Sequence, residues 1–415
     1  MISRNNFLPI LLLVIGVVTL VNCAPSVPCV VGGAGRRVGR LGPDATTNIC
    51  GTGGGGGGGS TTCSSTLMPT EVLLSVDIKG NVLEYGLNAT TGVPTLMCNT
   101  ATGSPGPLVV TPNNNFLYTL SADTAQIFGF QIAHAKSGAL AAITGSPFKL
   151  SEPVNGGNGV ATITADPLNR FIFVTNNGGD VHVLSIGQSG ALAEVTNSPF
   201  TVTTPGNIAI APPGSFAYVP SAGNGNIVIF SISSTGQLTQ TGFSTVPDLT
   251  DPAVFALVHP NGKFLFTADF QSVASYTIDP ILGTLTLVGT TVPTAQQQIE
   301  PDGLALDNTG KFLYVVPAGT LGGTNFQSTN IMGYQIDVSG GSGALSAIPN
   351  APFTSSSTLG LTANPMGPEL YVFSEATAPT VMIFTATIDT LGNLTIPATG
   401  LTVTAAFPPV VANIQ

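Results

Sequence analysis

Short apolar runs alternate with tight polar turns along most of this chain, and one such unit recurs. In its plainest form the unit reads PDGLALDNTGKFLYVV (Pro301–Val316), which is an apolar run, a polar turn and a second apolar run, the pattern of a β-hairpin. Related stretches are Thr164–Asn176, Ile210–Pro220, Leu257–Asp269 and Thr362–Phe373. A hairpin that cannot bury its own faces must stack against copies of itself. The pattern therefore predicts a repeat protein.

Each repeat contains four predicted strands. The first is apolar, the second is centred on a Phe-x-Tyr/Phe-Val phrase, a third follows, and the fourth opens with Gly-x-Leu, as in SGALAAITGSPF (Ser137–Phe148) and SGALAEVTNSPF (Ser189–Phe200). Four antiparallel strands make one blade of a β-propeller, and six complete blades can be traced in this way.

A seventh blade is assembled from both ends of the predicted ring. Glu71–Cys98 supplies three strands but no inner strand before them. Val410–Asn413, near the C-terminus, resembles the inner-strand ending Leu361–Asn364 and supplies the missing strand. The sequence thus predicts an all-β, seven-bladed propeller of four-stranded antiparallel blades, with the ring closed by the C-terminal strand joining the N-terminal blade. Closure removes the exposed sheet edges that invite aggregation.

Composition agrees with an all-β fold and excludes one class of partner. The chain has 51 Gly and 32 Pro, only 7% charged residues and a mean hydropathy of +0.41, so it is too apolar for disorder and too punctuated for long helices. Ten Lys and Arg against 20 Asp and Glu give a net charge of −10. Nucleic acid is excluded as the expected partner, because phosphate contacts need clustered basic residues.

The N-terminal segment has the pattern of an export signal. An apolar run at residues 7–21 follows Arg4 and precedes Cys23, and it is too short to span a bilayer comfortably. Leu20-Val21-Asn22-Cys23 resembles a bacterial lipobox, whose Cys is acylated, although Asn22 replaces the usual small residue. Cleavage nearby without acylation and a retained anchor are the alternatives. The chain is therefore expected to be exported to the cell envelope and held at a bacterial membrane through lipidated Cys23.

The predicted domain organisation has three parts: residues 1–23 form the signal, 24–70 a flexible glycine-rich stalk, and 71–415 the propeller. Four further cysteines are Cys29, Cys50, Cys63 and Cys98, and an even count in an exported chain favours disulfides with three possible pairings. We expect Cys63 to pair with Cys98 and Cys29 with Cys50, because the segment just before the first blade must pass near Cys98.

The turns of D/HPxGKFLYV type, the SGxL strand openings and the G/NSPF endings together resemble the seven-bladed propeller lactonase family, the 6-phosphogluconolactonase-like propellers, over residues 71–415. Phe173–Asn176 also resembles the YVTN propellers of microbial surfaces, whereas the absence of Trp disfavours a WD40 propeller. The resemblance implies lactone hydrolysis by a Pro-Arg-His phrase and an Asn-Glu pair. These fall here on Ala253-Val254-Phe255 and Ala268-Asp269, so the Arg and His are absent and only a shortened carboxylate remains. No catalytic residue is therefore predicted.

The histidines and acids are the remaining candidates for chemistry. His134, His182 and His259 are interpreted as structural or solvated, because nothing places a nucleophile near them. Acids gather on the propeller face that carries the links from second to third strand and from fourth strand to the next blade. These acids are Asp77, Asp123, Glu152, Asp180, Asp248, Asp251, Asp269, Glu300, Asp302 and Glu375. They are either solubilising charge or a rim that binds a ligand or cation, with Ca²⁺ as the possible cofactor.

Three functions remain open at this stage. The first is a cell-envelope propeller that binds an unidentified protein, glycan or cation on its acidic face. The second is an exported lactone hydrolase of the resembled family. The third is a structural, surface-layer-like propeller. Arg, His and a carboxylate converging near the ring axis would favour the enzyme, whereas only Asp, Asn and Ser there would favour binding.

Overall fold

A computed structural model divides the chain into two units, residues 1–49 and 50–415, and only parts of the second are described here. The described residues are 69–77, 79–102, 106–121, 124–134, 138–152, 162–176, 179–221, 224–245, 255–268, 272–291, 297–320, 328–375, 380–403 and 409–414. The regular elements in them are all β-strands. No helix in these ranges has the length and apolarity needed to cross a bilayer.

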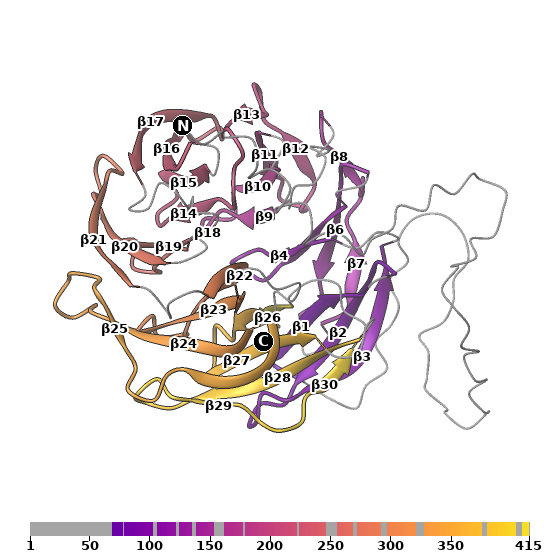
Figure 1. The fold of residues 1–415 in the computed structure, drawn as a ribbon. Helices are drawn as coiled ribbons and strands as arrows, with labels where there is room; N and C mark the ends of the chain where they lie inside the picture. The colour runs from indigo at the N-terminus through magenta and orange to yellow at the C-terminus, as the bar shows by residue number, and fades with distance from the viewer. Residues whose placement is uncertain are drawn as a thin grey trace, which may run out of the picture. The chain divides into compact units, whose positions relative to one another are not determined.

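The strands form seven antiparallel blades, confirming the predicted fold class (Figure 1). From inner to outer strand, blade 1 consists of β31 (Val410–Asn413), β1 (Glu71–Val76), β2 (Asn81–Leu87) and β3 (Pro94–Ala101), and blade 2 of β4 (Leu108–Val110), β5 (Phe116–Ser121), β6 (Gln126–Ile132) and β7 (Leu140–Ala142) with β8 (Phe148–Lys149). Blade 3 consists of β9 (Thr162–Ala165), β10 (Phe171–Asn176), β11 (Asp180–Ile186) and β12 (Leu192–Glu194) with β13 (Phe200–Thr201). Blade 4 consists of β14 (Ala209–Ala211), β15 (Phe216–Ser221), β16 (Asn226–Ile232) and β17 (Leu238–Thr245).

The remaining three blades continue the ring (Figure 1). Blade 5 consists of β18 (Phe255–Val258), β19 (Phe264–Ala268), β20 (Val273–Ile278) and β21 (Leu285–Thr291). Blade 6 consists of β22 (Gln297–Leu306), β23 (Phe312–Thr320), β24 (Ser328–Ile336) and β25 (Leu345–Ala347) with the start of β26. Blade 7 consists of β26 (Phe353–Ala363), β27 (Glu369–Glu375), β28 (Val381–Ile388) and β29 (Leu394–Thr395) with β30 (Leu401–Val403). β26 thus begins as an outer strand of blade 6 and ends as the inner strand of blade 7, pairing first with β24 and then with β27.

The ring closes as predicted. β31 pairs antiparallel with β1, with Glu71 opposite Asn413 and Leu74 opposite Val410. Inner strands of neighbouring blades contact one another, including β31 with β4 and β26 with β31. The first blade therefore takes its inner strand from the C-terminus, and this strand also lies between blades 7 and 2.

The outer strands differ from the single fourth strand that the sequence predicts. In blades 2 and 3 a tight turn divides the outer segment into two short strands, and both pieces pair with the third strand. A serine hydroxyl fills the gap in the ladder, since Ser146 Oγ accepts a hydrogen bond from Gly129 N and Ser198 Oγ accepts one from Val183 N, each at 3.0 Å. The serine of the SPF ending therefore supplies the hydrogen-bond acceptor that a continuous outer strand would have provided through its backbone.

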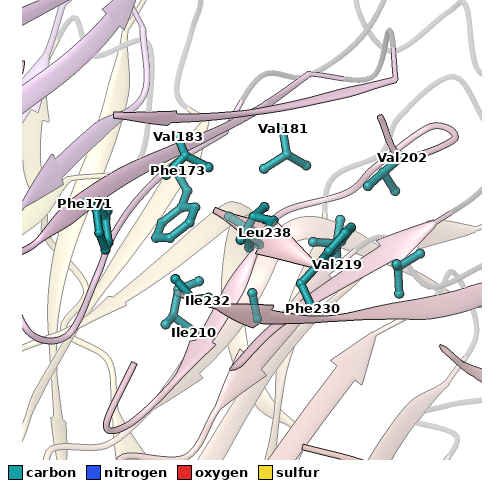
Figure 2. Packing of buried hydrophobic residues seen from close by; sticks show 13 residues of the cluster. Phe171, Phe173, Val181, Val183, Val202, Ile210, Val219, Phe230, Ile232 and Leu238 are labelled. Atoms are coloured by element: carbon teal, nitrogen blue, oxygen red, sulfur yellow. The ribbon is translucent and has the colours of Figure 1, made fainter. Parts of the chain in front are cut away.

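The apolar core is distributed over the seams between blades. Seven clusters of buried apolar residues occur in the described structure, one at each seam. Figure 2 shows the cluster between blades 3 and 4, where Phe171, Phe173, Val181 and Val183 lie close to side chains such as Phe230 of the next blade. Stability therefore depends on blades packing against their neighbours, as the repeat pattern predicts.

The Gly of the Gly-x-Leu phrase is explained by the same seams. It has a positive φ, and an added Cβ would come within 3.0 Å of the aromatic ring that opens the second strand of the preceding blade. The glycines and their facing rings are Gly190 on Phe116, Gly236 on Phe171, Gly283 on Phe216, Gly343 on Phe264 and Gly392 on Phe312. Only Gly combines this backbone conformation with such a close approach.

A tyrosine hydroxyl completes the contact at four seams, each donating to the carbonyl of the facing Gly. The pairs are Tyr118 to Gly190 (2.7 Å), Tyr218 to Gly283 (3.0 Å), Tyr314 to Gly392 (2.9 Å) and Tyr371 to Gly92 (3.0 Å). At the seam between blades 5 and 6, where Phe266 replaces the tyrosine, Ser275 Oγ donates to Gly343 O at 2.6 Å instead.

The seam between blades 3 and 4 has Phe173 at the tyrosine position (Figure 2). Phe173→Tyr is expected to place a hydroxyl on Gly236 O and to stabilise the fold by about 0.5–1.5 kcal/mol, the usual net value of one hydrogen bond. Urea unfolding measures the change, with Tyr218→Phe as the reverse control that removes such a bond. Destabilisation by Phe173→Tyr would mean that this fully buried site has no space for the oxygen.

Candidate functional site

The inner strands lie nearest the ring axis, and their composition is almost free of charge. The sequences of β31, β4, β9, β14, β18 and β26 contain no Asp, Glu, Lys, Arg or His. The exception is β22, which contains Glu300 and Asp302. By composition, the inner strands are therefore apolar and hydroxyl-bearing, and acidic residues occur in the sequence of only one of them.

The placement of Glu300 and Asp302 differs from the prediction that they lie in a connecting loop. β22 already begins at Gln297, since β23 extends to Thr320 and pairs with it through Gln297 and Ile299. Two shifts in register interrupt the pairing around this segment. Both acids are thus strand residues, although the structure describes only their backbone.

Three predicted rim acids, Asp77, Asp180 and Glu152, have described side chains. Asp77 is 6% exposed and accepts hydrogen bonds from Lys79 N, Asn81 N and Asn81 Nδ2, each at 2.8 Å, so its carboxylate caps the turn between β1 and β2. Asp180 is half-buried at the start of β11, opposite Asn176. Asp77 is therefore committed to its own turn, which leaves it poorly placed to bind a ligand.

The third of these, Glu152, is exposed after blade 2. The other predicted rim acids are placed less completely, and Glu375 ends β27 with only its backbone described. Asp123, Asp248, Asp251 and Asp269 lie outside the described residues. The opposite face also carries acids, which the sequence reasoning did not weigh. They are Glu71, Asp166, Asp279, Asp307, Asp337, Glu369 and Asp389.

Most of these opposite-face acids serve turns. Asp279 and Asp389 accept hydrogen bonds from backbone N–H groups of Leu282 and Asn393, and these bonds lower the pKa of both carboxyls, with a side-chain bond from Asn393 as the largest cause for Asp389. Asp166 binds the guanidinium of Arg170 at 2.9 Å, and Arg170 in turn donates to Gly214 O of blade 4. Charge on this face is therefore largely structural.

The positions that the family resemblance implies for catalysis carry apolar side chains where they are described. Phe255 is half-buried at the start of β18, and Ala268 is buried at the end of β19. Ala253, Val254 and Asp269 lie outside the described residues.

The sequence reasoning missed two polar residues at or next to the ends of second strands. Asn176 of β10 and Ser374 of β27 occupy equivalent positions, since each is the sixth residue from the start of its strand. Both are buried, and neither the Asn176 amide nor the Ser374 hydroxyl has a hydrogen-bond partner in the described structure. A comparison of the sixth residue of the second strand between repeats would have shown that this position is polar. It would not have shown that these side chains lack hydrogen-bond partners.

A buried hydrogen-bonded group lies within blade 3 and reaches the segment that follows blade 2. His182 is fully buried, and its Nδ1 donates to Glu194 Oε1 at 2.7 Å, while Ser198 Oγ donates to the same oxygen and Ser151 N to Oε2. Burial acts to raise the pKa of Glu194, but these hydrogen bonds outweigh burial and lower it to about 2. The group is structural, because the His182 ring is closed to solvent.

Two other predicted structural histidines are also placed. His259 is 4% exposed in the turn after β18; its Nε2 donates to Gly310 O at 2.7 Å, and its Nδ1 accepts from Asn261 N. His134 is exposed and bonds Asn115. A depression of about 500 Å³ beside Glu194, lined also by Asn197, Thr235 and Gln237, is open and lacks a titratable pair.

The described residues contain no group of three or more His, Cys, Asp or Glu side chains arranged to hold a metal ion. Cys98 lies on β3 opposite Glu84, with only its backbone described, and Cys23, Cys29, Cys50 and Cys63 lie outside the described residues. The predicted lipidation and both disulfide pairings stay predictions.

The fold and site thus define a seven-bladed propeller with an almost uncharged inner wall. A family model for the seven-bladed β-propeller lactonases matches residues 74–206 and 195–297, more than half of the chain. The protein belongs to this lactonase propeller family. A comparison with curated proteins finds no match.

Solved structures share the fold at low sequence identity. A Bacteroides fragilis protein with the provisional name 6-phosphogluconolactonase is 18% identical, with a TM-score of 0.64, covering 84% of this chain and 99% of its own. A similarly named Bacteroides uniformis protein is 17% identical with a TM-score of 0.66, covering 82% and 99%. The periplasmic gluconolactonase of Pseudomonas aeruginosa is 15% identical with a TM-score of 0.64, covering 83% and 100%.

Proposed function

We propose that this lactonase-family propeller is a binding module held outside the cytoplasm, and that it takes a cationic or uncharged ligand near the ring axis. The observation that carries the proposal is the composition of the inner strands: six of the seven have no charged residue, and the charged residues in the sequence of the seventh are both acidic. A basic protein segment, a glycan or a divalent cation fits such a wall better than an anion does.

The same wall argues against phosphorylated sugar lactones as substrates. A phosphate group is normally held by Arg, Lys or backbone N–H clusters. The propeller region has six basic residues, Lys79, Lys136, Lys149, Arg170, Lys263 and Lys311, and none is on an inner strand. Arg170 is already committed to Asp166 and Gly214.

The location rests on the sequence. The signal pattern, Cys23 and the glycine-rich stretch support a lipid anchor with a spacer before the propeller. A singly acylated chain binds membranes only marginally, so stable attachment requires the multiple acylation that a lipobox cysteine receives.

The test is a melting-temperature panel with the full chain. Calcium and an oligolysine peptide are expected to raise the melting temperature, whereas 6-phosphogluconolactone is expected neither to raise it nor to be hydrolysed. A ligand at 100 times its dissociation constant adds about 2.7 kcal/mol to the stability of the bound state. Combined Glu300→Gln and Asp302→Asn substitutions should remove the shift, and Glu369→Gln on the opposite face should retain it. A shift with the phosphorylated lactone alone would overturn the proposal.

Hydrolysis of a neutral sugar lactone is the second candidate, and family membership favours it. Glu300 and Asp302 are the inner-strand groups that can serve as general base for water attacking a lactone carbonyl. Hydrolysis of gluconolactone that is lost in the combined variant would replace the binding function by this activity.

A further inference from the structure

The seam between blades 7 and 1 differs chemically from the other six. At five seams a Phe opens the second strand and packs on the Gly of the next blade, and at a sixth Val72 packs on Gly138. At the closing seam this position holds Glu369, and an added Cβ on Gly92 would lie 2.7 Å from Glu369 Cγ. A carboxylate therefore stands where the repeat otherwise places an apolar side chain.

One amide joins this carboxylate to a second one across the seam. Asn364 Nδ2 donates to Glu369 Oε2 at 3.0 Å and to Glu71 Oε2 of blade 1 at 3.1 Å, while Asn364 Oδ1 accepts from Met366 N. Asn364 is 2% exposed, whereas Glu71 and Glu369 are each half-buried, so the two carboxylates are bridged at a partly dehydrated point. Glu71 Oε1 is also buried, without a hydrogen-bond partner in the described structure.

Among the described residues, no salt bridge to a basic side chain compensates this pair. The charged contacts found in them, Arg170 with Asp166 and His182 with Glu194, lie within blade 3. Further titratable groups on the packed strands are Tyr371, whose pKa is raised by burial and by the charges of Glu369 and Glu71, and Glu84 and Tyr85 of β2, whose pKa values are raised by burial. Asn413 of β31, opposite Glu71, and Gly92 in the neighbouring turn carry no charge.

Two carboxylates that share a site cannot both ionise without cost. Burial raises the pKa of Glu71, the hydrogen bond from Asn364 opposes that rise, and the charge of Glu369 raises it further. The pKa of Glu71 in the folded state is thus raised above 4.5. The contribution of Glu71 to folding stability is therefore complete below pH 4.5 and is lost as the pH rises through that raised pKa.

We propose that Glu71, Asn364 and Glu369 form a proton-dependent latch of the propeller ring. With one carboxyl protonated, the pair shares the Asn364 amide and the seam is closed. With both ionised, their repulsion favours local opening of the closing strand β31, which is paired to β1 beginning at Glu71 and Asn413. The latch is independent of any ligand at the inner wall.

Hydrogen exchange of the full chain at about pH 5 and about pH 8, corrected for intrinsic exchange rates, tests the latch, because it reports local opening. Protection of residues 409–414 is expected to fall several-fold at the higher pH relative to protection of β16. Glu71→Gln and Glu369→Gln should each restore most of the lost protection at the higher pH, since either change removes the charge repulsion and keeps the side-chain shape.

Glu152→Gln is the matched control, because Glu152 is exposed and lies outside the seam; its exchange pattern should equal that of the unmodified chain. The latch is refuted if protection of residues 409–414 is equal at the two pH values. It is also refuted if both glutamine variants leave that protection unchanged, or lower it, at the higher pH.

Discussion

Removing Pro409–Gln415 is expected to abolish most of the folding stability of this protein. The deletion takes away β31, the inner strand of blade 1, and leaves β1 with an unpaired edge. It also removes Ala412 and Ile414, both fully buried, and Val411, which is 9% exposed. Burial of a side chain such as Val411 or Ile414 is worth about 1.5–3 kcal/mol, against a typical domain stability of about 5–15 kcal/mol.

Circular dichroism melting and size-exclusion chromatography of the full and shortened chains measure the loss. We expect a large fall in melting temperature and aggregation through the open edge of β1. Removal of Gln415 alone is the control and should change neither measurement. An unchanged melting curve after the longer deletion would contradict closure by β31.

Glu84→Gln is expected to stabilise the protein strongly at alkaline pH and little at acid pH. Glu84 lies on β2, is fully buried, and accepts a hydrogen bond from Thr100 Oγ1 at 2.7 Å. Burial raises its pKa to about 7, and the Thr100 bond offsets only part of that rise. Glutamine keeps the acceptor for Thr100 and removes the buried charge.

The sign follows from the raised pKa. The folded state holds its proton more tightly than the unfolded state, so the contribution of Glu84 is complete below 4.5 and is lost as the pH rises to about 7. The loss amounts to about 3 kcal/mol at most. Urea unfolding across this range measures it, with Glu152→Gln as the exposed control. A constant difference between Glu84→Gln and the unmodified chain at all pH values would show that Glu84 does not titrate in this range.

The fold was predictable because each blade repeats its own markers. The Gly of the fourth strand, the Phe that opens the second strand and the likeness of Val410–Asn413 to Leu361–Asn364 all have a geometric cause in the seams. The interrupted outer strands were not predictable in the same way, because the acceptor role of Ser146 and Ser198 depends on a turn whose geometry the pattern does not encode.

The candidate site was only partly predictable. Acids could be assigned to a face from their position between strands, but the extent of β22 decides that Glu300 and Asp302 are strand residues, and this depends on the length of β23. Pairs such as His182 with Glu194 arise from the third and outer strands of one blade, and the unpartnered amide of Asn176 depends on what surrounds it. Such properties follow from tertiary packing and not from local pattern.

The seam contacts between tyrosine or phenylalanine and glycine have a direction, since the ring always comes from one blade and the glycine from the next. Each blade from 2 to 7 thus presents an aromatic ring to the next blade and a glycine to the preceding one. This is a head-to-tail arrangement, and it forms a closed ring only when the rotations between successive blades add up to a full circle. Internal duplication of a single blade would therefore create a new boundary that is complementary from the outset. A copied blade would therefore need no matching second mutation for its seam contacts to form.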